Sequence, residues 1–241
     1  MTQANGEGRG VVMLSGASRG IGTAIAQRLY DDGYTLSLGV RDRARIDPEL
    51  AADTARVLVQ HYDAFDAASP AAWVAATLAR FGRIDALINN AGILLEISLE
   101  RGDESALDQM WEVNVKGPYR TIRAAMPALR MGGHGRVINI ASTDGKRYRP
   151  TDSIGYSMTK HAVMALTHAA RFDGWESGVR ATALCPGAVD TELIAHLASA
   201  SPVADRLSPE TVADTIAFLL SLPNNATVAE LVLNTRLEPS L

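Results

Sequence analysis

The chain has 241 residues, of which 47% are hydrophobic and 21% charged, and its formal net charge is −4. This mildly acidic balance gives no basis for expecting nucleic acid or an anionic membrane as a partner. No run of 18 apolar residues occurs and the first ten residues are polar, so we expect neither a membrane span nor a signal peptide. Cys185 is the single cysteine; it cannot form an intramolecular disulfide, which fits a cytoplasmic protein.

Short apolar runs alternate with longer helical stretches along the chain. Ile21, Ile25 and Leu29 recur at i, i+4 and i+8, which predicts a helix over 21–30 after a first strand at 11–14. Further strands are predicted at 34–40, 55–60, 84–88, 136–141, 180–184 and 228–233, and further helices at 70–80, 107–130, 154–175 and 209–220. Ser69 is predicted to cap the helix 70–80, with Pro70 in its first position.

This alternation of strands and helices predicts βαβ units and a parallel sheet with helices on both faces. The expected fold class is therefore α/β, a doubly wound Rossmann fold of about seven strands with right-handed crossovers. No repeat or linker divides the chain, so we expect residues 1–241 to form a single domain with flexible residues 1–9. The longest irregular stretch, 191–208, is expected to be functional or mobile.

A glycine-rich segment follows the first predicted strand and opens the first helix: Ser15-Gly16-Ala17-Ser18-Arg19-Gly20-Ile21-Gly22. Glycines permit a sharp turn and let backbone N–H groups approach a pyrophosphate. A helix N-terminus adds free donors and a partial positive charge. The segment therefore predicts a phosphate-binding turn. A glycine-rich turn without a ligand is the less favoured alternative, because a strand-to-helix junction is the context that this motif requires.

Further motifs follow in order: Asn89-Asn90-Ala91-Gly92, then Tyr156 and Lys160 as YxxxK, then Pro186-Gly187 with Val189 and Thr191 as PGxVxT. With the GxxxGxG glycines, they resemble the motifs of the classical short-chain dehydrogenases/reductases, from about residue 10 to residue 233. Ser142 lies 14 positions before Tyr156, one more than is usual in that family. The C-terminal region lacks the family's glycine-rich ending and resembles that of 3-hydroxy acid and clavulanate-type aldehyde reductases.

The resemblance implies a nicotinamide cofactor. It assigns cofactor binding to Gly16, Ser18, Arg19, Gly20, Ile21, Gly22, Arg41, Asp63, Asn90, Ala91, Gly92, Tyr156, Lys160, Pro186, Gly187, Val189 and Thr191. For Asp63, the implied adenine contact competes with an ordinary role in a turn.

The residues after the second predicted strand bear on the choice between NADP(H) and NAD(H). An acidic residue at the strand end would bind the ribose 2′-OH, but Val40 stands there and Arg41 follows. Arg19 and Arg41 can clamp a 2′-phosphate through charge-assisted hydrogen bonds. We therefore expect NADP(H); NAD(H) is the alternative if Asp42 reaches the ribose.

Tyr156 and Lys160 stand at i and i+4, which places them on one face of a helix. A neighbouring ammonium lowers the pKa of a tyrosine hydroxyl, which is ordinarily about 10. The resemblance implies that Tyr156 is the general acid/base, that Lys160 lowers its pKa and holds the nicotinamide ribose, and that Ser142 binds the substrate oxygen. It further implies that Asn114 holds a water for proton relay. The implied reaction is hydride transfer between nicotinamide and a carbonyl or secondary alcohol.

The substrate, a small carbonyl or alcohol molecule, is expected at the carboxyl ends of the strands, between segments 93–98, 143–153 and 192–207. The third segment offers an apolar cover. Its apolar residues are Leu193, Ile194, Leu197 and Ala198. In the second segment, Lys146, Arg147 and Arg149 suggest either a cationic wall for a carboxylated substrate or, as the favoured interpretation, an ordinary basic loop.

Alternative functions and partners complete the set of expectations. A cofactor-binding sensor or scaffold without turnover is the main alternative, but it has little need of Asn114, Ser142, Tyr156 and Lys160 together. An epimerase or dehydratase has little room for a separate sugar-binding part. No histidine pair has supported ligand spacing, so we expect no metal. The resemblance implies a homodimer or homotetramer that pairs through helices 107–130 and 156–175.

Overall fold

The structure is a computed structural model that describes residues 9–148, 153–197 and 200–235. Seven strands form one sheet in the order β3-β2-β1-β4-β5-β6-β7, and every neighbouring pair is parallel. The strands are β1 (Val11–Ser15), β2 (Thr35–Val40), β3 (Val57–His61), β4 (Ala86–Asn89), β5 (Arg136–Ile140), β6 (Arg180–Pro186) and β7 (Glu230–Leu233). The order reverses between β1 and β4, as in a doubly wound sheet. The predicted fold class is confirmed.

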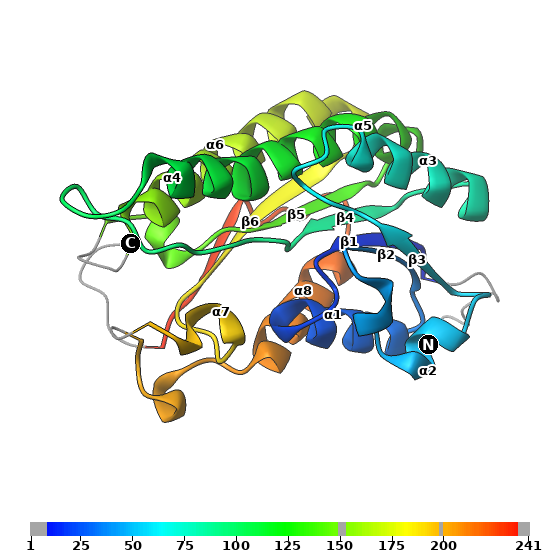
Figure 1. Ribbon diagram of the computed structural model, residues 1–241. Helices are drawn as coiled ribbons and strands as arrows, with labels where there is room; N and C mark the ends of the chain where they lie inside the picture. Colours follow the sequence, from blue (N-terminus) through cyan, green and yellow to red (C-terminus); the bar gives the residue numbers. More distant parts are fainter. Residues whose placement is uncertain (1–8, 149–152, 198–199, 236–241) are drawn as a thin grey trace.

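Helices cover both faces of the sheet (Figure 1). One layer holds α3 (Ser69–Phe81), α4 (Glu104–Trp111), α5 (Gly117–Met131) and α6 (Ile154–Gly174), and the other holds α1 (Gly20–Asp31) and α8 (Pro209–Ser221). Two short helices, α2 (Pro48–Ala52) and α7 (Glu192–Ala195), lie in connections where the sequence predicts no helix. The flexibility expected for residues 1–9 falls almost wholly outside the described residues.

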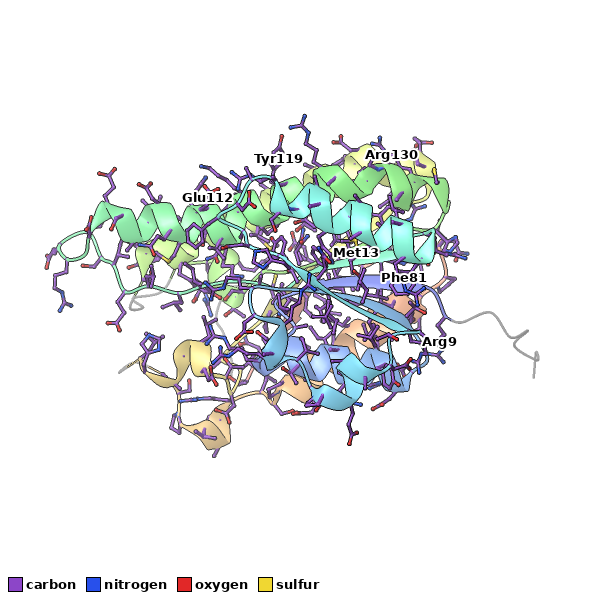
Figure 2. All side chains as sticks on the ribbon, turned by 45° about the vertical axis from the view of Figure 1, so that its right-hand side comes forward. Arg9, Met13, Phe81, Glu112, Tyr119 and Arg130 are labelled. Carbon is purple, nitrogen blue, oxygen red and sulfur yellow. The ribbon has the colours of Figure 1, made fainter. Side chains whose placement is uncertain are left out.

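Two apolar clusters, one on each face of the sheet, make up most of the core, and a third, smaller cluster includes Val163 and Cys185. Successive side chains of a strand point to opposite faces, so Met13 and Leu14 of β1 enter different clusters. Leu14 packs with Ile25 of α1, whereas Met13 packs with Trp73 of α3 and with Leu129 of α5. All five side chains are fully buried, and Figure 2 shows Met13 between the sheet and the helices above it. Burial of this apolar surface is the main driving force that holds the layers together.

Helical structure spans the range predicted at 107–130, but it contains a π turn that the sequence analysis did not predict. A π turn at Glu112–Lys116 separates α4 from α5, and the N–H of Gly117 donates to the carbonyl of Glu112. Pro118 explains the break, because it has no N–H to donate to the carbonyl of Asn114 four residues earlier. The proposed helix cap is wrong. Ser69 is the first residue of α3 and makes no cap hydrogen bond; its hydroxyl accepts from the N–H of Asp63 at 2.8 Å.

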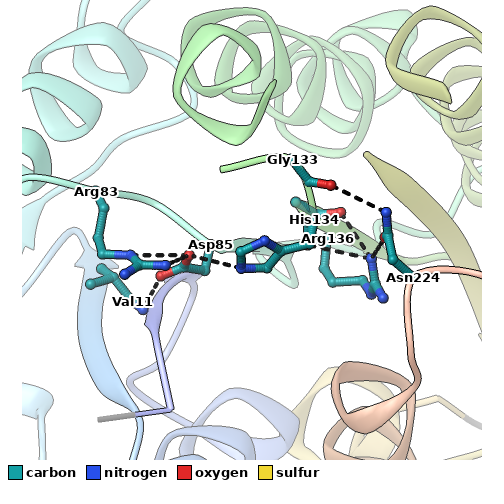
Figure 3. A network of polar contacts seen from close by, with 8 residues as sticks. Val11, Arg83, Asp85, Gly133, His134, Arg136 and Asn224 are labelled. Atoms are coloured by element: carbon teal, nitrogen blue, oxygen red, sulfur yellow. Dashed lines mark hydrogen bonds and ion pairs between the residues drawn. The ribbon is translucent and has the colours of Figure 1, made fainter. Parts of the chain in front are cut away.

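A polar network closes the edge of the sheet where the strands begin (Figure 3). Asp85, just before β4, accepts a hydrogen bond from the N–H of Val11 at 2.7 Å and pairs with Arg83 at 2.6 Å. Arg136, at the start of β5, donates to the carbonyl of Leu222 at 2.8 Å and to Asn224 Oδ1 at 2.7 Å. These bonds fasten β1 to β4, and β5 to the segment after α8.

Replacing Asp85 by alanine should destabilise the protein. The Asp85 side chain is 14% exposed, and its loss leaves the N–H of Val11 without its acceptor, at a cost of about 2 kcal/mol. Urea denaturation followed by circular dichroism measures the change. Asp205→Ala removes the same charge from an exposed 3₁₀ turn and serves as the control. Equal losses for the two variants would contradict the role given to Asp85.

Candidate active site

A cavity of about 670 Å³ opens at the carboxyl ends of the strands, and every residue that the resemblance assigns to cofactor binding lines it. Ser142 lines it too, whereas Asn114 lies behind its wall. The three segments expected around the substrate all contribute, through Ile93 and Leu94, through Thr143, Asp144 and Ser153, and through Leu193, Ile194 and Leu197. Ala198, proposed as part of the cover, lies outside the described residues.

The cationic wall does not form from the residues that the structure describes. Lys146 and Arg147 are absent from the lining of the cavity. Lys146 pairs with Glu230 of β7, and Arg147 pairs with Asp144 at 3.2 Å. Arg149 lies outside the described residues. Both described basic residues of this loop are therefore paired with carboxylates, Lys146 with a residue far away in the sequence and Arg147 with a residue three positions earlier.

The glycine turn between β1 and α1 forms one end of the cavity. Gly16 has a φ of +72°, and a Cβ there would lie 2.9 Å from the Cα of Ala91. A Cβ on Gly22 would overlap the carbonyl oxygen of Gly16. Arg19, which precedes α1, makes no side-chain cap hydrogen bond, so its side chain leaves the first-turn N–H groups of α1 to other acceptors. Closely packed backbone and an uncapped helix N-terminus suit a bound phosphate.

The segment after β4 braces this turn. The hydroxyl of Ser15 accepts from the N–H groups of Asn90 and Ala91 at 3.0 and 3.1 Å. The side-chain amide of Asn90 donates to the carbonyls of Ser15 and Gly16 at 3.1 and 3.0 Å. Asn90 thus lines the cavity while its amide fixes the backbone that a phosphate would contact.

Basic residues gather where β2 ends. The strand ends at Val40, and Arg41 and Arg45 both line the cavity. The carboxylate of Asp42 accepts from the N–H of Ala44 at 3.0 Å and so caps the 3₁₀ turn Arg43–Arg45. Sequence analysis did not identify Arg45, because the 3₁₀ turn that brings it to the cavity has no apolar period to reveal it.

Asp63 lies in the connection between β3 and α3. Its carboxylate accepts from the N–H of Phe65 at 3.1 Å, and the residue lines the cavity. Asp63 therefore both stabilises a turn and lies at the cavity.

Tyr156 and Lys160 lie on the first turns of α6, which begins after the N-cap Ser153. The hydroxyl of Ser153 accepts from the N–H of Tyr156 at 3.1 Å. The ammonium of Lys160 lies 5.4 Å from the centroid of the Tyr156 ring and donates to the carbonyl of Ile140 at 2.7 Å. The cap and this hydrogen bond hold α6 against the end of β5, next to Ser142.

Burial dominates the ionisation of both groups. It raises the pKa of Tyr156 well above its ordinary value; the carboxylate of Asp144 adds to the rise and a hydrogen bond with Ser142 opposes it. Burial lowers the pKa of Lys160 to about 8. The expectation that Lys160 depresses the pKa of Tyr156 is therefore wrong for this state of the protein. Asp144, a contributor that sequence analysis missed, lies two residues after Ser142.

Hydrogen bonds fix the side chains of Asn114 and Ser142. The side chain of Asn114 accepts from the N–H of Ile93 and donates to its carbonyl, both at 2.9 Å, and also donates to Thr159 at 3.1 Å. It joins the π turn to the segment after β4 and to α6. The hydroxyl of Ser142 accepts from the N–H of Asp144 at 3.1 Å, and its side chain is buried at the cavity wall.

The remaining predicted residues follow β6. The N–H of Gly187 donates to the carbonyl of Leu233 at 2.7 Å, and Val189 forms a bridge with Leu207. The thiol of Cys185 is buried, and burial raises its pKa to about 11, which makes it a poor nucleophile. In the ranges that the structure describes, no three His, Cys, Asp or Glu side chains are placed to hold a metal ion. Nor does any described helix have the length and apolarity to cross a membrane.

Comparison with known proteins identifies the family. A family model described as short chain dehydrogenase matches residues 10–201. The chain belongs to the short-chain dehydrogenase family. The resemblance seen in the sequence is thus confirmed.

Relatives of this chain differ in length, and the neighbouring solved structures differ in bound cofactor. It is 39% identical over 221 residues to the agropine synthesis reductase of Rhizobium rhizogenes, a match that covers 90% of this chain but 50% of the relative. The chain therefore spans about half the length of that relative. Among solved structures, an alcohol dehydrogenase of Thermococcus sibiricus, complexed with 5-hydroxy-NADP, is 34% identical with a TM-score of 0.86, over 95% of this chain and 99% of that one. A 3-ketoacyl-(acyl-carrier-protein) reductase of Brucella melitensis, complexed with NADH, is 28% identical with a TM-score of 0.84, over 94% and 97%.

Burial of Lys160 predicts a pH dependence of stability. Its pKa is about 8 in the folded protein and about 10.4 in an unfolded chain, so the unfolded state binds more protons between these values. The free energy of unfolding should therefore rise with pH across this window, by on the order of 3 kcal/mol for this group. Below pH 8 the cost of burying the charge is fully present.

Comparison with Lys160→Met isolates this contribution. Urea denaturation from pH 7 to 10.5 should show the wild type gaining stability relative to the variant as the pH rises. Parallel curves for the two proteins would mean that Lys160 does not carry the buried charge.

Proposed function

We propose that the protein is an NADP(H)-dependent oxidoreductase that transfers a hydride between nicotinamide and a carbonyl or secondary alcohol, with Tyr156 as the general acid/base. The observation that carries the proposal is one continuous cavity, with a glycine turn at one end and Tyr156, Lys160 and Ser142 in its wall. The single domain would comprise the whole chain of 241 residues.

The residues present fit a dinucleotide. The glycine turn and the uncapped N-terminus of α1 suit its pyrophosphate, and Pro186, Gly187 and Thr191 line the cavity beside Ser142 and Tyr156. When bound, the nicotinamide supplies or accepts the hydride. The protein positions the reactants and moves the proton.

Reduction of a carbonyl leaves an alkoxide that needs a proton, and Tyr156 is placed to donate one. Its raised pKa keeps the hydroxyl protonated at neutral pH, as a general acid requires. The Ser142 hydroxyl, fixed by the N–H of Asp144 at 3.1 Å, can donate to the same substrate oxygen. Lys160, with a pKa of about 8, is poised to gain or lose a proton near neutral pH and to restore the tyrosine.

The break after α4 supports a proton path through Asn114. Both amide hydrogens of Asn114 are already donated, to Ile93 and to Thr159, and its Oδ1 accepts from the N–H of Ile93. Pro118 offers no N–H to the carbonyl of Asn114, and π turns are frequent at functional sites. We therefore place the relay water on the main-chain carbonyl of Asn114.

The cation-rich end of the cavity supports NADP(H) over NAD(H). Arg19, Arg41 and Arg45 line it, and all can bind a 2′-phosphate. Asp42 also lines the cavity, but its carboxylate is engaged as the cap of a 3₁₀ turn, which leaves it less able to bind a ribose. The neighbouring structures include complexes with NADP-type cofactors and one with NADH, so the proposed preference rests on the residues of this chain.

Assembly and location are further parts of the proposal. The outer face of the α4–α6 layer exposes Trp111, Tyr119 and Phe172, and Tyr119 projects outward in Figure 2. These apolar side chains support a homodimer or homotetramer built through these helices. A free buried thiol at Cys185 suits the reducing cytoplasm.

Tyr156→Phe should reduce turnover by a factor of about 10² to 10⁴, because it removes the general acid without changing the ring. NADPH consumption is measured against a panel of aldehydes, ketones and oxo acids. Tyr119→Phe, at an exposed position on α5, should retain full activity. Tight NADPH binding with no turnover on the panel would instead favour a sensor or scaffold.

Arg41→Ala should raise the Kd of NADPH about tenfold and leave that of NADH unchanged, because it removes a charge-assisted hydrogen bond to the 2′-phosphate. Titration of intrinsic tryptophan fluorescence measures both constants. Arg43→Ala, two residues further along but hydrogen-bonded to Gln60, is the matched control. An equal effect of Arg41→Ala on the two cofactors would refute its role in cofactor choice.

A further inference from the structure

Arg19 joins the glycine turn to a distant segment of the chain. Its backbone precedes α1, while its guanidinium Nη1 donates to the Oε2 of Glu192 at 2.9 Å. Glu192 is the first residue of α7, and both residues line the cavity. Arg19, in the glycine turn, therefore contacts α7, which directly follows Thr191.

Several other polar contacts around α7 join residues of one segment, 186–208, to each other. Val189 forms a bridge with Leu207. Arg206, whose side chain is 9% exposed, pairs with Asp190 at 3.0 Å and donates to the carbonyl of Ser201 at 2.8 Å. The other side-chain hydrogen bonds of described residues 191–197 and 200–206 stay within the segment 186–208. Among these described residues, the Arg19–Glu192 pair is therefore the one side-chain polar contact that reaches the rest of the protein.

The pair is open to competition. The Arg19 and Glu192 side chains are 47% and 71% exposed, and ion pairs in water are weak. A phosphate monoester carries nearly two negative charges at neutral pH and offers three acceptor oxygens, so it binds a guanidinium more strongly than one exposed carboxylate does. A 2′-phosphate within reach of Arg19 would therefore displace Glu192.

We propose that Glu192 is a specificity-determining residue that competes with the cofactor's 2′-phosphate for Arg19. Binding of NADP(H) breaks the pair and frees α7 from its polar contact, whereas NAD(H) leaves the pair intact. Glu192 thus lowers the affinity for NADP(H) selectively and links α7 to the identity of the cofactor. The inference rests on the proposed binding of a nicotinamide dinucleotide with Arg19 at its 2′-phosphate.

A double-mutant cycle tests this competition. The Kd values of NADPH and NADH are measured by fluorescence titration for the full chain as wild type, Glu192→Gln, Arg19→Gln and the double variant. Glu192→Gln should lower the Kd of NADPH about threefold to fivefold and leave that of NADH unchanged. In the Arg19→Gln background, Glu192→Gln should change neither constant.

Two further variants sharpen the result. Glu192→Asp keeps the charge but shortens the side chain, so it should tighten NADPH binding by less than Glu192→Gln does. Asp205→Asn removes one negative charge from the same segment at a position outside the cavity lining, and it should leave both constants unchanged. Thermal unfolding of each variant confirms that it is folded.

Each other outcome overturns the competition. Weaker NADPH binding in Glu192→Gln would mean that Glu192 orients Arg19 for the phosphate. An effect that persists without Arg19 would mean direct repulsion between Glu192 and the phosphate, and an equal effect on NADH would mean a general change in the cavity. No effect on NADPH would mean no competition. A wild type that binds NADPH no better than NADH refutes the NADP(H) preference separately, because the cycle for NADPH alone still decides the role of Glu192.

Discussion

The close approach of two backbone segments, the glycine turn after β1 and the segment after β4, is the constraint on which the site depends. Gly16 lies against Ala91, and Gly22 lies against the carbonyl of Gly16, at separations that leave no room for a side chain. The hydroxyl of Ser15 and the amide of Asn90 fix this contact with four hydrogen bonds. Because the strand order reverses between β1 and β4, the contact lies at the point where a doubly wound sheet leaves a crevice for a ligand.

Much of this arrangement could be predicted from the sequence, because its determinants are local. Short apolar runs located all seven strands, and apolar residues at a helical period located the long helices. Motifs that follow the strands must meet at one edge of a parallel sheet. This is why every residue assigned to the cofactor lines one cavity. The π turn was missed although Pro118 signals it, because the apolar pattern continues through the break.

Other features could not be predicted, because they depend on residues far apart in the sequence. The pairing of Lys146 with Glu230 and that of Arg19 with Glu192 join positions separated by 84 and 173 residues, and no spacing rule connects them. The ionisation of Tyr156 is a second example. The i, i+4 spacing of Tyr156 and Lys160 predicted a lowered pKa for the tyrosine, but burial and the carboxylate of Asp144 raise it. The spacing of two residues indicates neither how deeply they are buried nor where the loop after β5 places Asp144.

The buried ammonium of Lys160 shows how the fold and the chemistry are coupled. Its amine donates to the carbonyl of Ile140 at 2.7 Å, at the end of the strand that precedes Ser142. The same burial that makes the charge costly brings its pKa to about 8, where a group exchanges protons readily at neutral pH. A lysine on the surface, with a pKa of about 10.4, would stay almost fully protonated at neutral pH. The instability that burial causes below pH 8 therefore has the same physical origin as the property that suits Lys160 to proton transfer.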